Sequence, residues 1–212
     1  MQGQAVSLKT KIMDAATRLF AQKGFRYTAI SEIAKAAGAA EGTIFHHFKS
    51  KEGLFLEVLK RAQGRIIHNV DENVHGREFS SGLEMVEEVV KVYFYMTEGL
   101  RSELALLYRS HSYELAVENS ACRKSLESIY NCFLTALVEG IVLGQKDGSI
   151  SKDILPTKTA LIILAMLNGL IRFDLAHIFP VDSLYNDVLK TCRRILKNYN
   201  VGEESSPALA GQ

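Results

Sequence analysis

The segment from Thr28 to Lys51, TAISEIAKAAGAAEGTIFHHFKSK, is the part of the chain that most narrows the possible folds. Apolar residues recur in it at helical spacing, and Gly38 interrupts the pattern. We therefore expect two short helices, over residues 28–37 and 40–48, joined by a tight glycine turn. This layout is a helix-turn-helix, whose second helix enters the major groove of DNA in the proteins that use it.

The rest of the chain shows the same helical character. Only three prolines occur in 212 residues, and we find no alternating apolar pattern bounded by hairpin turns. We predict an all-α fold of about nine helices. Residues 1–52 would form a small unit of three helices carrying the helix-turn-helix, and residues 53–200 a larger helical body. The polar residues 201–212 are expected to be a disordered tail.

The two parts differ in charge. Residues 1–65 contain 11 Lys and Arg against 5 Asp and Glu, whereas the remaining residues contain 14 against 19. This asymmetry favours a basic nucleic-acid module attached to an acidic body.

Cysteine usage and hydropathy indicate a cytoplasmic protein. Cys122, Cys132 and Cys192 form no CxxC pair, which is typical of reduced thiols. The first residues have no apolar core of a signal peptide. The longest apolar run, residues 160–167, is far shorter than the roughly 18 residues of a membrane span, so we expect no membrane partner.

Residues 8–55 resemble the DNA-binding domain of the TetR family of bacterial transcription regulators. The resemblance rests on three segments: LKTKIMDAATRLFAQKGF, TAISEIAKAAG and EGTIFHHFKSKEGLF, of which the last is the most specific. The helical remainder agrees with the family only loosely, in length and helix count. The resemblance implies a DNA-binding regulator rather than an enzyme, and the chain contains no HExxH, GxSxG, GxGxxG or P-loop signature.

The resemblance also implies which residues contact DNA: Thr28, Gly42, Thr43, Phe45, His46, His47 and Lys51. Residue chemistry agrees with this set. Gly42 keeps one face of the recognition helix small, so that its backbone can approach DNA. Lys51 stands beside free N–H groups at the start of a helix, which suits a phosphate. We expect Thr28 to cap the second helix, whose first amides would take another phosphate.

Two departures from the family pattern concern the recognition helix. Ala40-Glu41 stands where the family often has a polar-basic pair, and Phe45 stands where Tyr is common. Glu41 has three possible roles: it accepts a hydrogen bond from cytosine, it interacts favourably with the positive end of the helix dipole, or it only repels phosphate. Phe45 lacks the phenolic hydroxyl, which leaves packing or contact with a thymine methyl group.

The pair His46-His47 raises the question of a metal. Adjacent helical residues point in different directions, so we expect no shared metal ion. The choice between bases and phosphates as their DNA partners stays open. We expect no cofactor elsewhere in the chain.

The segment 156–177 is apolar on nearly all sides and therefore needs cover on two faces. In the TetR family the last two helices pair with a second subunit, so the resemblance implies a homodimer through residues 156–177 and 182–199. Two recognition helices would then read half-sites about 34 Å apart on a palindromic operator.

The resemblance further implies a pocket for a small, largely apolar effector between the helices of residues 82–177. Residues with large apolar faces and a few polar tips are its expected lining: Tyr93, Met96, Tyr108, His111, Tyr130, Phe133, Met166 and Phe173. We interpret Asp174 and His177 as a surface cluster and leave Arg172 open.

These expectations describe a repressor that a small molecule releases from DNA. A ligand-independent DNA-binding or scaffold protein is the alternative, and the long helical body argues against it.

Overall fold

The computed structural model describes residues 7–197, which form ten α-helices with one π-helical and one 3-10 turn. The helices are α1 (Leu8–Lys23), α2 (Ile30–Ala37), α3 (Glu41–Phe48), α4 (Lys51–Val70), α5 (Gly82–Gly99), α6 (Arg101–Tyr108), α7 (Ser110–Glu118), α8 (Ser120–Asp147), α9 (Pro156–Leu175) and α10 (Tyr185–Lys197). The short turns are η1 (Asp71–His75) and η2 (Asp182–Leu184). The predicted all-α fold is confirmed, with ten helices in place of nine.

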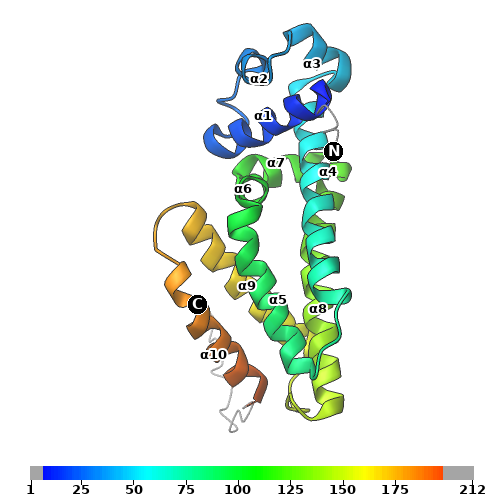
Figure 1. The fold of residues 1–212 in the computed structure, drawn as a ribbon, viewed down its shortest axis with the longest axis vertical. Helices are drawn as coiled ribbons and strands as arrows, with labels where there is room; N and C mark the ends of the chain where they lie inside the picture. The colour runs from blue at the N-terminus through cyan, green and yellow to red at the C-terminus, as the bar shows by residue number, and fades with distance from the viewer. Residues whose placement is uncertain (1–6, 198–212) are drawn as a thin grey trace, which may run out of the picture.

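Helices α1 to α3 form a small unit at one end of an elongated molecule (Figure 1). Its core comes from the apolar faces that the helical spacing predicts: Phe20, Ile33 and Ile44 are fully buried there. Gly38 ends α2 in the left-handed conformation, with φ of 65°, which a side chain would disfavour. The turn between α2 and α3 is thus determined locally.

The N-cap of α4 is Ser50, whereas the cap predicted for α2 differs from the one observed. Ser50 accepts a hydrogen bond from the backbone N–H of Gly53 at 2.9 Å. The N-cap of α2 is Ala29 rather than Thr28. The Thr28 hydroxyl is buried and donates to the carbonyl of Gly24 at 2.8 Å. The prediction was wrong because the unpaired carbonyls at the end of α1 lie within reach of this hydroxyl.

Helix α4 joins the small unit to the body. It packs against α1 and α3 near its start and against α5, α6 and α8 further along (Figure 1). Within residues 7–197, α8 is the only helix long and apolar enough to span a membrane by length and composition. It lies among α4, α5, α7 and α9, so its apolar residues are those of a central core helix.

Two glycines allow α5 and α8 to cross closely. A Cβ atom on Gly82 would lie 1.9 Å from the backbone N of Gly144. The start of α5 is also capped from the end of α8, because the Asp147 carboxylate accepts from the Gly82 N–H at 2.7 Å. Ser149 accepts from the N–H of Leu83 at 3.1 Å. At this end of the body, α5 and α8 are therefore joined both by their close backbone contact and by the hydrogen bonds that cap α5.

The helical stretch after α5 is broken at Arg109, which is extended with φ of −72° and ψ of 141°. No glycine or proline marks the break in the sequence. The Arg109 side chain instead donates to the carbonyls of Ala21 and Gln22 at 2.6 and 2.9 Å. The additional helix, α7, starts directly after this residue.

The end of the chain differs from the prediction by a few residues. Helix α9 ends at Leu175, because His177 has a left-handed φ of 54°. Helix α10 starts at Tyr185, after the turn η2. The expected end of the last helix at residue 199 and the tail at 201–212 lie outside the described residues.

Candidate DNA interface and effector site

The recognition helix α3 has one buried and one exposed side. Ile44 and Phe48 are 0% and 4% exposed and hold α3 against the rest of the small unit. The predicted contact residues on α3 lie at the surface: Glu41, Gly42, Phe45, His46 and His47 are exposed, and Thr43 is half-buried. They occupy the end of the molecule remote from the body (Figure 1). The structure therefore brings these residues together on one accessible helix.

Gly42 is not required by the packing of the small unit. A Cβ atom built on it would meet nothing within 4 Å. Its backbone is not in the left-handed region either. The free space around this position suits the close approach of a second molecule to the backbone of α3.

Thr28 and Lys51 lie differently from the other predicted contacts. Because the Thr28 hydroxyl points inward, a phosphate at α2 would have to use backbone N–H groups. Lys51 Nζ lies 4.5 Å from the centre of the Phe25 ring and donates a long hydrogen bond of 3.4 Å to Arg26 O. Desolvation by burial lowers the pKa of Lys51. Phosphate contact by either residue stays a prediction.

The prediction omitted two exposed residues, Lys49 at the end of the recognition helix and Tyr27 just before α2. Lys49 ends α3 with a left-handed φ of 66° and donates from Nζ to the carbonyl of His46 at 3.2 Å. Tyr27 is 82% exposed just before α2. Their basic and phenolic side chains, directly beside the helix-turn-helix residues in the sequence, could have identified them as candidate DNA contacts.

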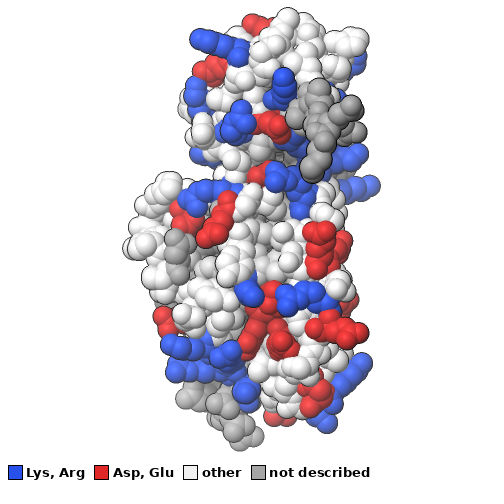
Figure 2. All heavy atoms as spheres, in the orientation of Figure 1, with Lys and Arg blue, Asp and Glu red and all other residues white. Residues whose placement is uncertain are grey.

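The face of the small unit seen in Figure 2 carries many Lys and Arg side chains, and they continue around its junction with the body. Asp and Glu side chains gather mainly on the body.

Within residues 7–197, no group of three or more His, Cys, Asp or Glu side chains is placed to hold a metal ion.

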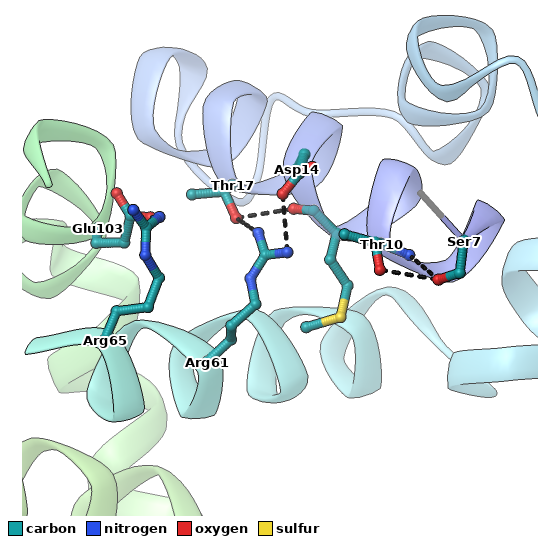
Figure 3. A network of polar contacts seen from close by, with 8 residues as sticks. Ser7, Thr10, Asp14, Thr17, Arg61, Arg65 and Glu103 are labelled. Carbon is teal, nitrogen blue, oxygen red and sulfur yellow. Dashed lines mark hydrogen bonds and ion pairs between the residues drawn. The ribbon is translucent and has the colours of Figure 1, made fainter. Parts of the chain in front are cut away.

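Two arginines of α4 bind opposite parts of the molecule (Figure 3). Arg61 donates to the Thr17 hydroxyl at 2.9 Å and pairs with Asp14 at 2.8 Å, both on α1. Arg65 pairs with the buried carboxylate of Glu103 on α6. These contacts join the small unit, α4 and the body. They could not be found from the sequence because the partners are far apart in the chain.

A cluster of tyrosines lies between helices of the body, from the buried Tyr93 to the exposed Tyr113. The hydroxyls of Tyr93 on α5 and Tyr108 on α6 both donate to Asn168 Oδ1 on α9, at 2.8 and 2.6 Å. The hydroxyls of Tyr113 and Tyr130 are 2.7 Å apart. Burial raises the pKa of Tyr108 to about 12 and also raises the pKa of Tyr93 and Tyr130. The phenols therefore stay neutral, and Tyr93 and Tyr108 keep the hydrogen that each donates to Asn168.

The predicted lining residues divide between this cluster and other places. Phe133 packs edge-on against Tyr93, with ring centres 4.7 Å apart. Met96 instead borders a separate cleft of about 300 Å³ between α4 and α5. Met166 is half-buried against the core.

Two of the predicted lining residues lie away from the tyrosines. His111 stacks on Phe25 of the small unit, with ring centres 3.8 Å apart. Phe173 is 42% exposed and contacts Phe179. The prediction chose both from their residue type and the resemblance, and an effector contact by either stays a prediction.

A cleft of about 260 Å³ adjoins the tyrosine cluster, between the end of α1, α6 and α9. Its lining includes Ala21, Ala105, Tyr108, Arg109, Arg172 and Leu175. Arg172, which the sequence left open, thus borders a cleft. Asp174 is half-buried and pairs with Arg101 at 2.7 Å, whereas His177 is exposed.

The fold and the exposed helix α3 define a helical DNA-binding protein with a helix-turn-helix at one end and a separate body. The sequence model of "Bacterial regulatory proteins, tetR family" matches residues 12–58. The chain is 31% identical over 143 residues to the "Fatty acid metabolism regulator protein" of Bacillus subtilis (strain 168), a match that covers 65% of this chain and 71% of the relative. The chain belongs to the TetR family of bacterial regulatory proteins.

Solved structures share the whole fold. A putative transcriptional regulator from Saccharomonospora viridis in complex with choline superposes with a TM-score of 0.76 at 23% identity, covering 86% of this chain and 93% of that one. The regulator FadR from Bacillus subtilis in complex with stearoyl-CoA gives a TM-score of 0.68 at 23% identity, covering 88% and 96%. The resemblance predicted from the sequence is confirmed, and the chain is a DNA-binding transcription regulator of this family.

Proposed function

We propose that this regulator is a cytoplasmic repressor, which binds a palindromic operator as a homodimer and is released from it by a small-molecule effector. The observation that carries the proposal is the accessible recognition helix α3, whose Gly42 backbone faces free space. Glu41 and Phe45, exposed on the same helix, are the residues we expect to determine the operator sequence.

The homodimer is supported by the exposed apolar side of α9. Leu161 and Ile162 are 49% and 57% exposed, although the opposite side of the helix is buried in the body. Ile178 and Phe179, in the link to α10, are each 58% exposed. Exposed apolar groups near the start of α9 and just beyond its end favour a protein–protein contact along this helix. We propose that α9 and α10 of two copies meet there, which would place two recognition helices on successive half-sites.

Release by an effector requires a ligand that distinguishes the DNA-bound conformation from another one. The tyrosine cluster and the adjoining cleft offer hydroxyls, an amide and a guanidinium beside apolar walls. The named ligands of the two solved relatives, choline and stearoyl-CoA, differ in charge and size. Neither is therefore carried over to this chain, and the site here argues for a small ligand with polar groups.

Fluorescence anisotropy with the DNA upstream of the protein's own gene tests the proposal, measured over a range of salt concentrations. Affinity should fall steeply with salt, since Lys and Arg contacts release counterions from DNA. Lys51→Ala should weaken binding to all sequences alike and reduce the salt slope by about one. Absence of binding, or binding that salt does not change, would refute the DNA-binding proposal.

A second set of measurements concerns sequence preference and the alternative function. Glu41→Ala should relax the preference at one base pair by about 1–3 kcal/mol if Glu41 reads cytosine. A uniform gain in affinity would show that Glu41 acts only by repulsion. The ligand-independent alternative predicts that no small molecule changes the affinity for DNA, and a metabolite extract that weakens binding excludes it.

A further inference from the structure

The cleft between α1, α6 and α9 contains a cation without a counter-ion. Among the side chains that the structure describes, none forms a hydrogen bond or an ion pair with the Arg172 guanidinium. Arg172 and Tyr108, a member of the tyrosine cluster, line the same cleft. The neighbouring acid Asp174 is already paired with Arg101. Arg172 is thus free to receive an anion from solution.

A second guanidinium lines the same cleft. Arg109 uses Nε and Nη2 to donate to the carbonyls of Ala21 and Gln22 at the end of α1. Its remaining N–H groups make no hydrogen bond with the described residues. Arginine presents five donors in one plane, so the unused N–H groups of Arg109 can reach a ligand in the cleft.

The walls of the cleft limit the size and shape of its ligand. Ala105 and Leu175 are apolar and Tyr108 contributes an aromatic ring with a hydroxyl. The volume of about 260 Å³ is near the lower end of the roughly 300–1,000 Å³ typical of small-molecule sites. A long acyl-CoA does not fit in such a space, but a single ring or a short chain with one acidic group does.

We propose that this cleft binds a small carboxylate with an apolar body, held by Arg172 and within reach of Arg109. A carboxylate carries a full negative charge, so it attracts a guanidinium more strongly than a neutral carbonyl does. The bound ligand therefore competes with Ala21 and Gln22 for Arg109 and loosens the contact between α1 and the body. This second step rests on the proposed DNA-binding function, whereas ligand binding in the cleft does not.

Isothermal titration calorimetry of the full-length protein without DNA tests the binding step, with benzoate as the probe and benzamide as its uncharged counterpart of the same shape. Benzoate should bind about ten-fold or more tightly than benzamide, because only the anion gains a charge-assisted contact. Arg172→Gln should remove this preference and leave the affinity for benzamide within two-fold. Arg194→Gln, on the exposed side of α10, makes the same change in charge and should preserve the preference.

The comparison of the two probes in the unaltered protein needs no variant, so misfolding cannot obscure it. Equal affinity for benzoate and benzamide overturns the proposal, as does an equal loss of benzoate binding in Arg172→Gln and Arg194→Gln. Arg172→Lys keeps the charge without the planar fork and should retain part of the preference.

The regulatory step is measured separately, by DNA anisotropy with and without benzoate. Benzoate should weaken DNA binding of the unaltered protein and have no effect on Arg109→Gln. A protein that binds benzoate but no DNA refutes the proposed function and leaves the carboxylate site standing. A protein that binds DNA with the same affinity in saturating benzoate overturns the role of Arg109.

Discussion

Arg61 and Arg65 lie one turn apart on α4 and bind different parts of the molecule, Arg61 the helix α1 and Arg65 the buried Glu103 of α6. A short stretch of α4 therefore determines how the small unit and the body are held together. The contacts at Arg65 and Arg109 lead to predictions that can be measured without DNA or ligand.

Arg65→Met should destabilise the protein by about 1–3 kcal/mol, because it leaves the Glu103 carboxylate, 6% exposed, without its partner. The estimate is at the low end for a buried pair since the Arg65 side chain is 52% exposed. Glu103→Leu should suppress most of this loss in the double variant. Urea unfolding of the two single variants and the double variant measures the coupling, and strictly additive effects would show that the pair is not coupled.

Arg109→Ala should lower the free energy of unfolding by about 1–2 kcal/mol, since it removes the hydrogen bonds to Ala21 and Gln22. Amide hydrogen exchange should become faster at the end of α1. Arg123→Ala is the matched control, because Arg123 donates to two carbonyls within the body, Ala116 and Val117. Exchange in α1 that responds equally to both variants would contradict a specific contact.

Gly82→Ala should destabilise the protein by about 2–3 kcal/mol, because its Cβ would lie 1.9 Å from the backbone of α8 and the helices would have to move apart. Gly64→Ala on α4 provides the comparison. A Cβ at Gly64 meets nothing within 4 Å, so the substitution should stabilise the helix by about 0.5–1 kcal/mol. Thermal unfolding distinguishes the two, and similar midpoints would show that the crossing of α5 and α8 is looser than described.

Asp147 should make the free energy of unfolding depend on pH. Hydrogen bonds from Ser149 and from the backbone N–H of Gly82 lower the pKa of Asp147. A lowered carboxyl pKa stabilises the fold above the unfolded pKa of about 3.9, and this stabilisation disappears as the pH falls through the folded value. Asp147→Asn should therefore be less stable than the original at pH 6, and the difference should narrow below pH 4. A difference that does not change with pH would mean that capping alone is lost.

Gly42→Ala separates the needs of folding from those of DNA binding. The fold has room for the methyl group, so the stability of the variant should be unchanged or higher by about 0.5–1 kcal/mol. DNA affinity should nevertheless fall, because the methyl group keeps the backbone of α3 away from DNA. Unfolding curves and anisotropy are compared on the same preparation, and unaltered DNA affinity would place Gly42 outside the interface.

Local patterns in the sequence were sufficient for the helices and for the exposure of the recognition helix. Helical spacing and the stop at Gly38 depend on residues a few positions apart, so they can be read without knowing the fold. The same holds for the cap at Ser50 and for the buried positions Ile44 and Phe48, which leave the other side of α3 exposed.

Only the tertiary structure decided where long-range partners meet. Three features depend on an element other than their own. They are the direction of the Thr28 hydroxyl, the break at Arg109, and the contact of Tyr93 and Tyr108 with Asn168. Side chains of this kind can satisfy their hydrogen bonds in several ways, and the partner that lies nearest after packing is the one they use. The sequence thus determined the helices and the class of protein, whereas packing determined how the small unit is connected to the body.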